Sequence, residues 1–285
     1  MKNDISKLKQ VAAVHDISGY GKCSLTVAIP ILSAMGLEVL PVPSAVLSMN
    51  TEFPDFSFLD LTNYLDEFIG SWKHNNVTFD AVYSGFLGSK QQIQIVKSLI
   101  TEFSAKISIV DPVMGDNGKL FKTYNDEMCN ELKSLVTLAD IITPNVTEAC
   151  ILTGQKFFGN ELNTEQTDVL LKGLQELGCE NVVITGITNK DKLILRGIEN
   201  GENFEIETEL LDFFLSGTGD LFTSVLTGAY VNGDTLINSI KKASGFVINA
   251  MQFSKQIGVT HAHGVAFEPL LKELMGKGSL LDVGI

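Results

Sequence analysis

The chain has 285 residues, of which 45% are hydrophobic, with 25 glycines and only seven prolines, a composition that supports one large buried core. We therefore expect a single α/β domain over residues 1–285. Asp and Glu number 34 against 21 Lys and Arg, a formal net charge of −13, which argues against nucleic acid and anionic membranes as partners.

The cysteines and the N-terminal segment indicate a reducing compartment. The four cysteines lie far apart in the sequence and show no metal-ligand spacing, so they are predicted to be reduced thiols. Residues 1–10 lack the apolar segment of a signal peptide, and no apolar run approaches the length of a membrane span. A cytoplasmic location is expected.

Strand and helix patterns alternate along the first half of the chain. Short apolar runs predict strands, and apolar residues at helical spacing predict helices. The expected strands are 11–14, 38–46, 79–83 and 107–110, and the expected helices are 25–35, 59–72 and 92–103. Short connections between such elements imply right-handed crossovers and a parallel sheet covered on both faces.

The second half continues the alternation and adds a hairpin. A fifth strand breaks at Pro144 into a helix. The later elements are expected at 164–177 (helix), 181–185 (strand), 193–196 with 204–207 (an antiparallel hairpin at the sheet edge), 219–231 and 234–256 (long helices) and 269–275 (a terminal helix).

The first loop, residues 15–24, offers two nucleotide motifs that it does not complete. Gly19 and Gly21 fit a dinucleotide fingerprint, but Ser24 stands where the third glycine is needed. A Walker loop is disfavoured because Cys23 follows the lysine where Ser or Thr would hold magnesium. We interpret the segment as a polar loop at the carboxyl end of a central strand, where open α/β sheets bind ligands.

Asp111 follows the strand 107–110 and is fixed by Pro112. A carboxylate in that place is suited to meet a metal or a phosphate-bound magnesium ion, although Asp also caps turns often, and both interpretations stay open. The following residues, 116–125, are expected to form a mobile surface loop that can close over a ligand.

Asn145 and Glu148 lie three residues apart in the first turn of the helix after Pro144, so their side chains project from the same side. One interpretation is a capping box, with Asn145 as N-cap and Glu148 reaching back to it. The other is that Glu148 faces a metal ion through water. Further along, His261 and His263 lack carboxylate partners at a useful spacing, so structural or solvent roles are expected.

Residues 217–220, Gly-Thr-Gly-Asp, open an apolar helical run and form what we call the glycine turn. Glycine lets a ligand approach the main chain, and the first amides of the following helix can hold an anion, for which phosphate is the expected choice. Asp220 would stand beside the group that receives that phosphate. As a bare pattern this is weak, because Asp at such a place is often a plain helix cap.

These motifs occur together in one order: Asp-Pro-Val-Met-Gly at 111–115, Leu-Ala-Asp-Ile-Ile-Thr-Pro-Asn at 138–145 with Glu148, and Gly-Thr-Gly-Asp-Leu-Phe at 217–222. With them the chain resembles the ribokinase-like superfamily, and within it the vitamin B6 kinases. The resemblance implies a three-layer α/β/α sandwich with a mostly parallel sheet and an antiparallel edge hairpin. It also implies transfer of phosphate from ATP, with Mg²⁺, to the 5′-hydroxymethyl group of pyridoxal, pyridoxamine or pyridoxine, by a homodimer.

The resemblance also implies roles for single residues. Asp220 is expected to be the catalytic base, and Gly217, Thr218 and Gly219 the anion hole. Asp111 and Glu148 are expected near magnesium and the ATP phosphates, with Asn145, Thr185 and Thr218 near the nucleotide. Asp16, Ser44, Thr51 and Phe86 correspond to positions that line the vitamin pocket, next to Asp220.

Three departures from related families bear on the substrate. Pyrimidine kinases of thiamine synthesis commonly carry Cys where this chain has Asp220, and no inserted β-lid like that of the sugar kinases is seen between residues 36 and 60. The first loop, however, has His15 and Asp16 where the B6 kinases often have Ser followed by His. A hydroxymethylpyrimidine substrate therefore stays open, as does a non-catalytic module that binds a nucleotide or vitamin.

Overall fold

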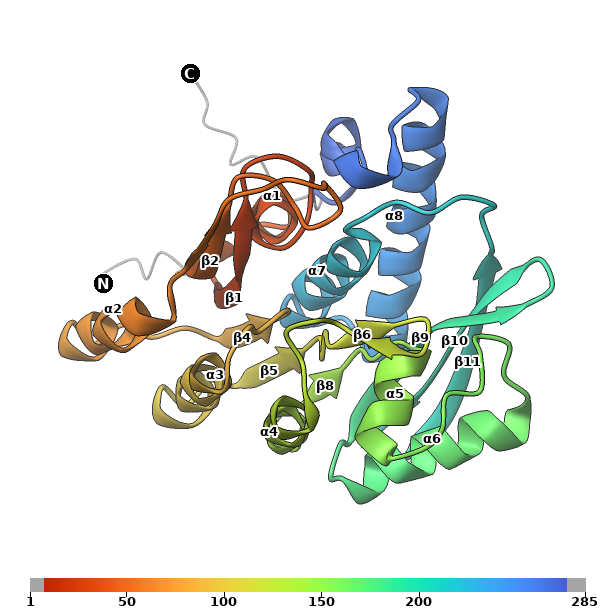
Figure 1. The fold of residues 1–285 in the computed structure, drawn as a ribbon, viewed down its shortest axis with the longest axis horizontal. Helices are drawn as coiled ribbons and strands as arrows, with labels where there is room; N and C mark the ends of the chain where they lie inside the picture. The colour runs from red at the N-terminus through yellow and green to blue at the C-terminus, as the bar shows by residue number, and fades with distance from the viewer. Residues whose placement is uncertain (1–7, 276–285) are drawn as a thin grey trace, which may run out of the picture.

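The computed structural model describes residues 8–275, which fold around one nine-stranded sheet with the order β11-β10-β9-β8-β5-β4-β1-β2-β3 (Figure 1). The predicted domain limits of 1 and 285 lie outside the described residues. The sheet strands are β1 (Gln10–Ser18), β2 (Glu38–Leu47), β3 (Phe58–Asp60), β4 (Ala81–Ser84), β5 (Ile107–Val110), β8 (Ile141–Ile142), β9 (Asn181–Asn189), β10 (Lys192–Glu199) and β11 (Glu202–Glu209).

Helices connect these strands as the alternation predicts. They are α1 (Leu25–Ala34), α2 (Thr62–His74), α3 (Lys90–Glu102), α4 (Asp126–Val136), α5 (Val146–Thr153), α6 (Thr164–Glu176), α7 (Thr218–Val231) and α8 (Leu236–Gln256). Among the residues described, no helix is both long and apolar enough to span a bilayer.

The sheet is parallel from β2 through β1, β4, β5 and β8 to β9. At one edge β9, β10 and β11 pair antiparallel, which confirms the predicted hairpin. At the other edge β3 pairs antiparallel with β2. All the parallel strands end at the same edge of the sheet, so the loops that follow them gather there.

Helices cover both faces, which confirms the three-layer sandwich (Figure 1). One apolar core contains side chains of α2, α3, α4, α5 and α6, and the other contains side chains of α1, α7 and α8. Strand β1 contributes side chains to both cores, because successive side chains of a strand point to opposite faces of the sheet. Ala12 and Val14 lie in the first core and Val11 in the second.

Three element predictions were wrong in part. The helix expected from residue 59 begins at Thr62, because Phe58–Asp60 pairs with β2 and the Asp60 carboxylate accepts the Thr62 N–H (2.8 Å). The expected loop 116–125 holds one strand and the end of another in a small hairpin, β6 (Gly115–Asp116) with β7 (Lys119–Leu120). The terminal helix is a 3₁₀ helix, η2 (Glu268–Glu273), and a second 3₁₀ turn, η1 (His261–His263), precedes it.

Candidate active site

Four carboxylates lie at the edge of the sheet where the parallel strands end. Asp16 belongs to the end of β1, Asp111 follows β5, Glu148 lies in the first turn of α5, and Asp220 lies in the first turn of α7. The last three are close enough to affect one another in series, since the charge of Asp220 raises the pKa of Asp111 and that of Asp111 raises the pKa of Glu148. The structure thus brings together residues that are up to about two hundred positions apart in the chain.

The glycine turn forms the N-terminus of α7. Gly217 is the N-cap, with φ of 76°, a left-handed conformation that glycine adopts without cost. A Cβ there would come within 2.3 Å of the Lys22 carbonyl oxygen, whereas a Cβ on Gly219 would have no neighbour within 4 Å. Gly217 is therefore needed for packing, and Gly219 leaves open space over the turn.

The first amides of α7 have no partner within the described part of the chain. The first helical bond is the one from Leu221 N to Gly217 O (2.9 Å), and no acceptor is found in residues 8–275 for the N–H groups of residues 218, 219 and 220. Thr218 does not cap the helix, since its hydroxyl donates to Leu215 O (2.7 Å). Three free donors at the positive end of a helix dipole form a site suited to an anion.

Asp220 turns away from its own helix. Its Oδ2 accepts the N–H of Ser24, at the start of α1, at 2.9 Å. The Ser24 hydroxyl in turn donates to Asp16 Oδ1 at 2.7 Å. A dinucleotide at the first loop would need its pyrophosphate at the start of α1, and that amide already donates to Asp220.

A bulge in β2 sets the position of Asp16. His15 pairs with Pro43 and Ile17 with Val46, so Asp16 lies opposite Ser44 and its neighbour on β2. Both Asp16 and Ser44 are buried. The structure therefore brings together two of the four residues expected to line the vitamin pocket.

The capping box at α5 is formed in full. Glu148 N donates to Asn145 Oδ1 (2.9 Å), and Asn145 N donates to Glu148 Oε2 (2.8 Å). Glu148 Oε1 also accepts the N–H of Met114 (3.1 Å), which ties α5 to the loop after Asp111. Both carboxylate oxygens of Glu148 therefore accept main-chain hydrogen bonds, and the expected role toward a metal stays a prediction.

Burial raises the pKa of each of these carboxyls, because a low-dielectric interior disfavours charge. The pKa of Asp220 is raised to about 7 by burial, partly offset by the hydrogen bond from Ser24. The pKa of Asp111 is raised to about 7 by burial and by the charge of Asp220. Burial and Asp111 raise the pKa of Glu148 well above its usual range. The cluster therefore favours binding of a cation or a proton.

Within residues 8–275 no three His, Cys, Asp or Glu side chains converge as a ready-made metal cage. Asp111 has Thr223 as a hydroxyl neighbour, 3.4 Å from Oδ2, and Glu148 is fully hydrogen-bonded. This donor set fits a magnesium ion that takes one or two carboxylates and fills its other positions with phosphate oxygens and water.

The remaining predicted residues are Thr185, Phe86 and Thr51. Thr185 pairs with Asn145 in a parallel bridge, and its N–H donates to Pro144 O (2.9 Å). Phe86 follows β4, is half-buried and meets the Tyr124 ring edge-on at 6.1 Å. Thr51 is exposed in the loop after β2, and no contact in the structure links it to Asp220.

Three residues of the site were not predicted from the sequence. Ser24 joins Asp220 to Asp16, and Thr223 lies beside Asp111 one turn after Asp220. Tyr83 is fully buried under the cluster, where burial and the charges of the two aspartates raise its pKa. Only Thr223 carried a sequence signal, its position three residues after Asp220 on the same helix.

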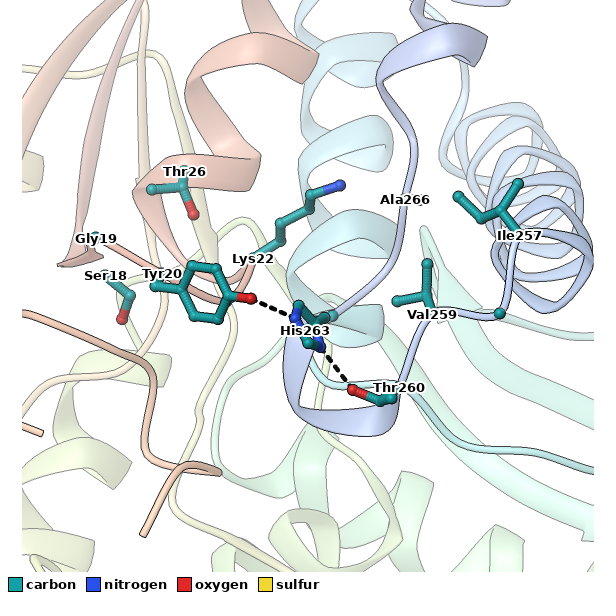
Figure 2. Close-up of a pocket in the computed structure, with 13 residues that line it drawn as sticks. Ser18, Gly19, Tyr20, Lys22, Thr26, Ile257, Val259, Thr260, His263 and Ala266 are labelled. Carbon is teal, nitrogen blue, oxygen red and sulfur yellow. Dashed lines mark hydrogen bonds between the residues drawn. The ribbon is translucent and has the colours of Figure 1, made fainter. Parts of the chain in front are cut away.

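A hollow lies between the first loop and the segment 257–266 (Figure 2). It has a volume of about 440 Å³ and is lined by residues 18–22, Thr26 and the segment 257–266. His263 projects into it with hydrogen bonds to Tyr20 and Thr260 (Figure 2). None of the four carboxylates lines it, so it is separate from the carboxylate cluster.

A family model described as phosphomethylpyrimidine kinase matches residues 33–266. The chain belongs to this family. A pyridoxal kinase of Dictyostelium discoideum is 31% identical over 240 residues, covering 76% of this chain and 77% of that protein. The resemblance to the vitamin B6 kinases is confirmed.

Two solved structures are similar over nearly the whole chain. A Bacteroides thetaiotaomicron protein described as a phosphomethylpyrimidine kinase, crystallised with pyridoxal, is 39% identical with a TM-score of 0.87 over 94% of this chain and 96% of that one. Pyridoxal kinase of Lactobacillus plantarum is 26% identical with a TM-score of 0.88, over 94% and 97%. The fold is therefore ribokinase-like, as expected from the motifs.

Proposed function

We propose that the protein is an ATP-dependent kinase that phosphorylates the 5′-hydroxymethyl group of pyridoxal, pyridoxamine or pyridoxine. The observation that carries the proposal is the geometry at the start of α7. Three main-chain donors that have no partner among residues 8–275 lie next to a carboxylate that is held by the N–H of Ser24. A phosphoryl group and the alcohol that receives it need such neighbours. The kinship with pyridoxal kinases supports the same conclusion.

Asp220 acts as the base in this mechanism. The Ser24 N–H holds one oxygen, Oδ2, so the other is left to accept the proton of the hydroxymethyl group. A pKa raised to about 7 makes the carboxylate a stronger base than an exposed aspartate, and a base is most effective when its pKa lies near the working pH. Since the deprotonated form is required, kcat/KM should rise as the pH increases through about 7.

The glycine turn stabilises the transferring group. Phosphoryl transfer depends mainly on positioning and on neutralising charge. The free amides of residues 218–220 point from the helix N-terminus, and the open space at Gly219 lets a phosphate approach them. Each such donor contributes about 3 kcal/mol in comparable sites.

Asp111 and Glu148 are the residues that would hold a magnesium ion bound to ATP, Asp111 directly and Glu148 through water. That ion, when bound, neutralises phosphate charge. Burial raises the pKa values of these two carboxyls in the free protein, and the charge of Asp220 on Asp111 and of Asp111 on Glu148 raises them further, so a cation stabilises their ionised forms. We place the nucleotide beside Asn145, Thr185 and Thr218.

On the vitamin side we place Asp16, Ser44, Thr51 and Phe86. Asp16 is buried, its Oδ1 accepts from Ser24, and burial raises its pKa. A carboxyl group held there can accept or donate a hydrogen bond to a ring hydroxyl or ring nitrogen. Because both pyridines and aminopyrimidines offer such groups, Asp16 alone does not separate the two substrate classes.

An assay of ADP release tests the proposal, with pyridoxal, pyridoxamine, pyridoxine and hydroxymethylpyrimidine compared under the same conditions. The expected result is ADP release with at least one B6 vitamer and a lower kcat/KM with the pyrimidine. The family description favours hydroxymethylpyrimidine kinase as the second candidate, and a higher kcat/KM with the pyrimidine would establish it instead. Ligand binding without ADP release would identify a non-catalytic module.

Two further proposals accompany this function. We infer a homodimer from the resemblance, to be measured by sedimentation velocity, with a single monomeric boundary as the contrary result. We also place the protein in the cytoplasm, in keeping with its four unpaired cysteine thiols. Fractionation of cells that express a tagged chain tests the location.

A further inference from the structure

The turn at residues 260–264 joins three loops that surround the candidate active site. It contacts the first loop through the bond from Lys22 N to His263 O (3.0 Å). It contacts the loop 48–53 through Asn50 Nδ2 and Ala262 O (2.9 Å). It contacts the segment before the glycine turn through Ser216 N and His261 O (3.2 Å). We call this turn the clasp.

The loop 48–53 has few other supports. The main-chain N–H of Asn50 donates a hydrogen bond to Tyr20 O in the first loop (2.9 Å). The centroids of the Phe53 and Tyr20 rings are 5.4 Å apart. The same loop carries Thr51, which we place beside the vitamin. Contacts of the clasp with this loop therefore influence the vitamin side of the site.

His261 makes two contacts that together define its charge. Its Nδ1 lies 3.2 Å from the carbonyl oxygen of Phe214, and its Nε2 lies 3.0 Å from Glu52 Oε2. A carbonyl and an ionised carboxylate only accept hydrogen bonds, so both contacts are hydrogen bonds only when each ring nitrogen carries a proton. The arrangement is satisfied by the imidazolium cation, and a neutral ring satisfies only one of the two contacts.

His263, two residues away, has no such requirement. Its ring nitrogens meet the hydroxyls of Tyr20 and Thr260, the two bonds drawn in Figure 2. A hydroxyl donates or accepts as needed, so a neutral His263 keeps both bonds. The two histidines of the clasp therefore differ in what the loss of a ring proton does to their hydrogen bonds.

We propose that His261 is a positioning residue, whose cation links the loop 48–53 to the segment before the glycine turn and so favours binding of the vitamin. The proposal rests on the function proposed above. Imidazole changes charge between about pH 5 and 8. When the His261 ring is neutral, Glu52 faces an unprotonated nitrogen, the link is lost, and affinity for the vitamin falls.

The surrounding charges leave Glu52 as the partner of His261. Tyr20 meets His263, Lys22 pairs with Glu268 (2.7 Å), and Lys255 pairs with Asp212 (2.7 Å). On the first loop and the glycine turn, Asp16 and Asp220 bond to Ser24, and His15 and Cys23 are the other titratable groups. The His261 and Glu52 side chains are 47% and 45% exposed, so their ion pair is worth at most about 1 kcal/mol. The expected effects are accordingly several-fold rather than orders of magnitude.

Glu52→Gln separates this proposal from a merely structural contact. A glutamine amide can donate to a neutral Nε2, so this variant keeps the link when His261 loses its proton. The wild-type protein does not. Glu52→Ala and His261→Ala lose the link at every pH, and His263→Gln serves as the matched control on the same turn.

The first measurement is the dissociation constant of pyridoxine, which has no aldehyde to react with lysines, by titration calorimetry between pH 6 and 8.5. The ratio of the Glu52→Gln value to the wild-type value cancels the titration of the ligand and of Asp220. We expect this ratio to fall about 2- to 5-fold across the range. The corresponding ratios for Glu52→Ala and His261→Ala should fall by a similar factor, because only the wild-type protein loses a link as the pH rises. A ratio for Glu52→Gln that stays constant with pH would overturn the proposal.

The second measurement does not depend on the function. Amide hydrogen exchange of peptides covering 48–57, corrected for intrinsic rates, should be about 2- to 5-fold faster in His261→Ala than in wild type at pH 6. His263→Gln loses the ring contacts with Tyr20 and Phe53 but keeps the His261–Glu52 pair, so its exchange relative to wild type should not change with pH. Equal exchange in His261→Ala and wild type would overturn the link. If the wild-type protein bound no vitamin, the proposed function would fail, and this second measurement would still decide the link.

Discussion

Two helices of the site begin with the same spacing and use it in opposite ways. In α5 the N-cap is Asn145 and the third helical residue is Glu148; in α7 the N-cap is Gly217 and the third is Asp220. Glu148 closes back on its own N-cap, so the start of α5 is satisfied within itself. Asp220 reaches instead to Ser24 of α1, and the start of α7 stays open.

The difference shows that an acidic residue in the first turn of a helix does not always have the same structural role. The glutamate side chain is long enough to return to the N-cap amide, which is the geometry of a capping box. The shorter aspartate follows a glycine N-cap that offers no side chain, and another helix supplies its partner. A self-satisfied N-terminus positions a loop, whereas an open one can bind an anion.

Among the substitutions that test this comparison, Asp220→Asn should have the largest effect on activity. The amide cannot accept the proton of the alcohol, so kcat should fall about 10²- to 10⁴-fold, while ATP binding stays nearly unchanged. Steady-state kinetics with a separate titration of ATP measure both quantities. Unchanged turnover would remove Asp220 from the mechanism.

The two glycines of the turn should respond differently to alanine. Gly219→Ala places a methyl group in the open space where the phosphate is expected, so kcat/KM should fall about 10²-fold with little loss of stability. Gly217→Ala meets the Lys22 carbonyl and a left-handed φ, so it should lower the free energy of unfolding by about 2 to 3 kcal/mol. Urea unfolding and kinetics on both variants distinguish these effects. An active Gly219→Ala enzyme would argue against the anion site.

Glu148→Gln tests whether Glu148 does more than cap the N-terminus of α5. Glutamine closes the same box in α6, where Asn163 and Gln166 are paired in this way. The capping role should therefore survive, while loss of charge should raise the KM for magnesium-ATP about 10- to 100-fold. Gln166→Glu is the matched control and should leave the kinetics unchanged. If Glu148→Gln behaved like the control, Glu148 would be a cap alone.

The smallest expected effect concerns pH and stability. Because the pKa of Asp111 is raised from 3.8 to about 7, the folded protein holds a proton there that the unfolded chain releases. Its contribution to stability is therefore present at low pH and is lost as the pH rises from about 4 through about 7. Asp111→Asn does not titrate, so its unfolding free energy relative to wild type should increase by about 1 to 2 kcal/mol over that range. Urea denaturation at pH 5 and pH 8 measures this, and a constant difference would contradict it.

The local pattern of apolar residues predicted most of the architecture, because apolar residues mark the positions that are buried. Apolar runs placed β1, β4 and β5, and helical spacing placed α1, α3, α6, α7 and α8, each within a few residues. β3 was missed because Phe58, Leu59 and Asp60 are all exposed, and without burial a strand has no apolar signal. Its pairing with β2 is decided across the sheet edge.

The sequence by itself determined the layered α/β fold, the glycine turn and the set of carboxylates, since periodicity, glycine and strand ends are local features. Only the tertiary structure decided which group each carboxylate faces. The Asp220–Ser24 bond spans 196 residues, and the His261–Glu52 pair spans 209. Such contacts depend on how strands are ordered in the sheet, and the strand order β8-β5-β4-β1-β2 does not follow the chain.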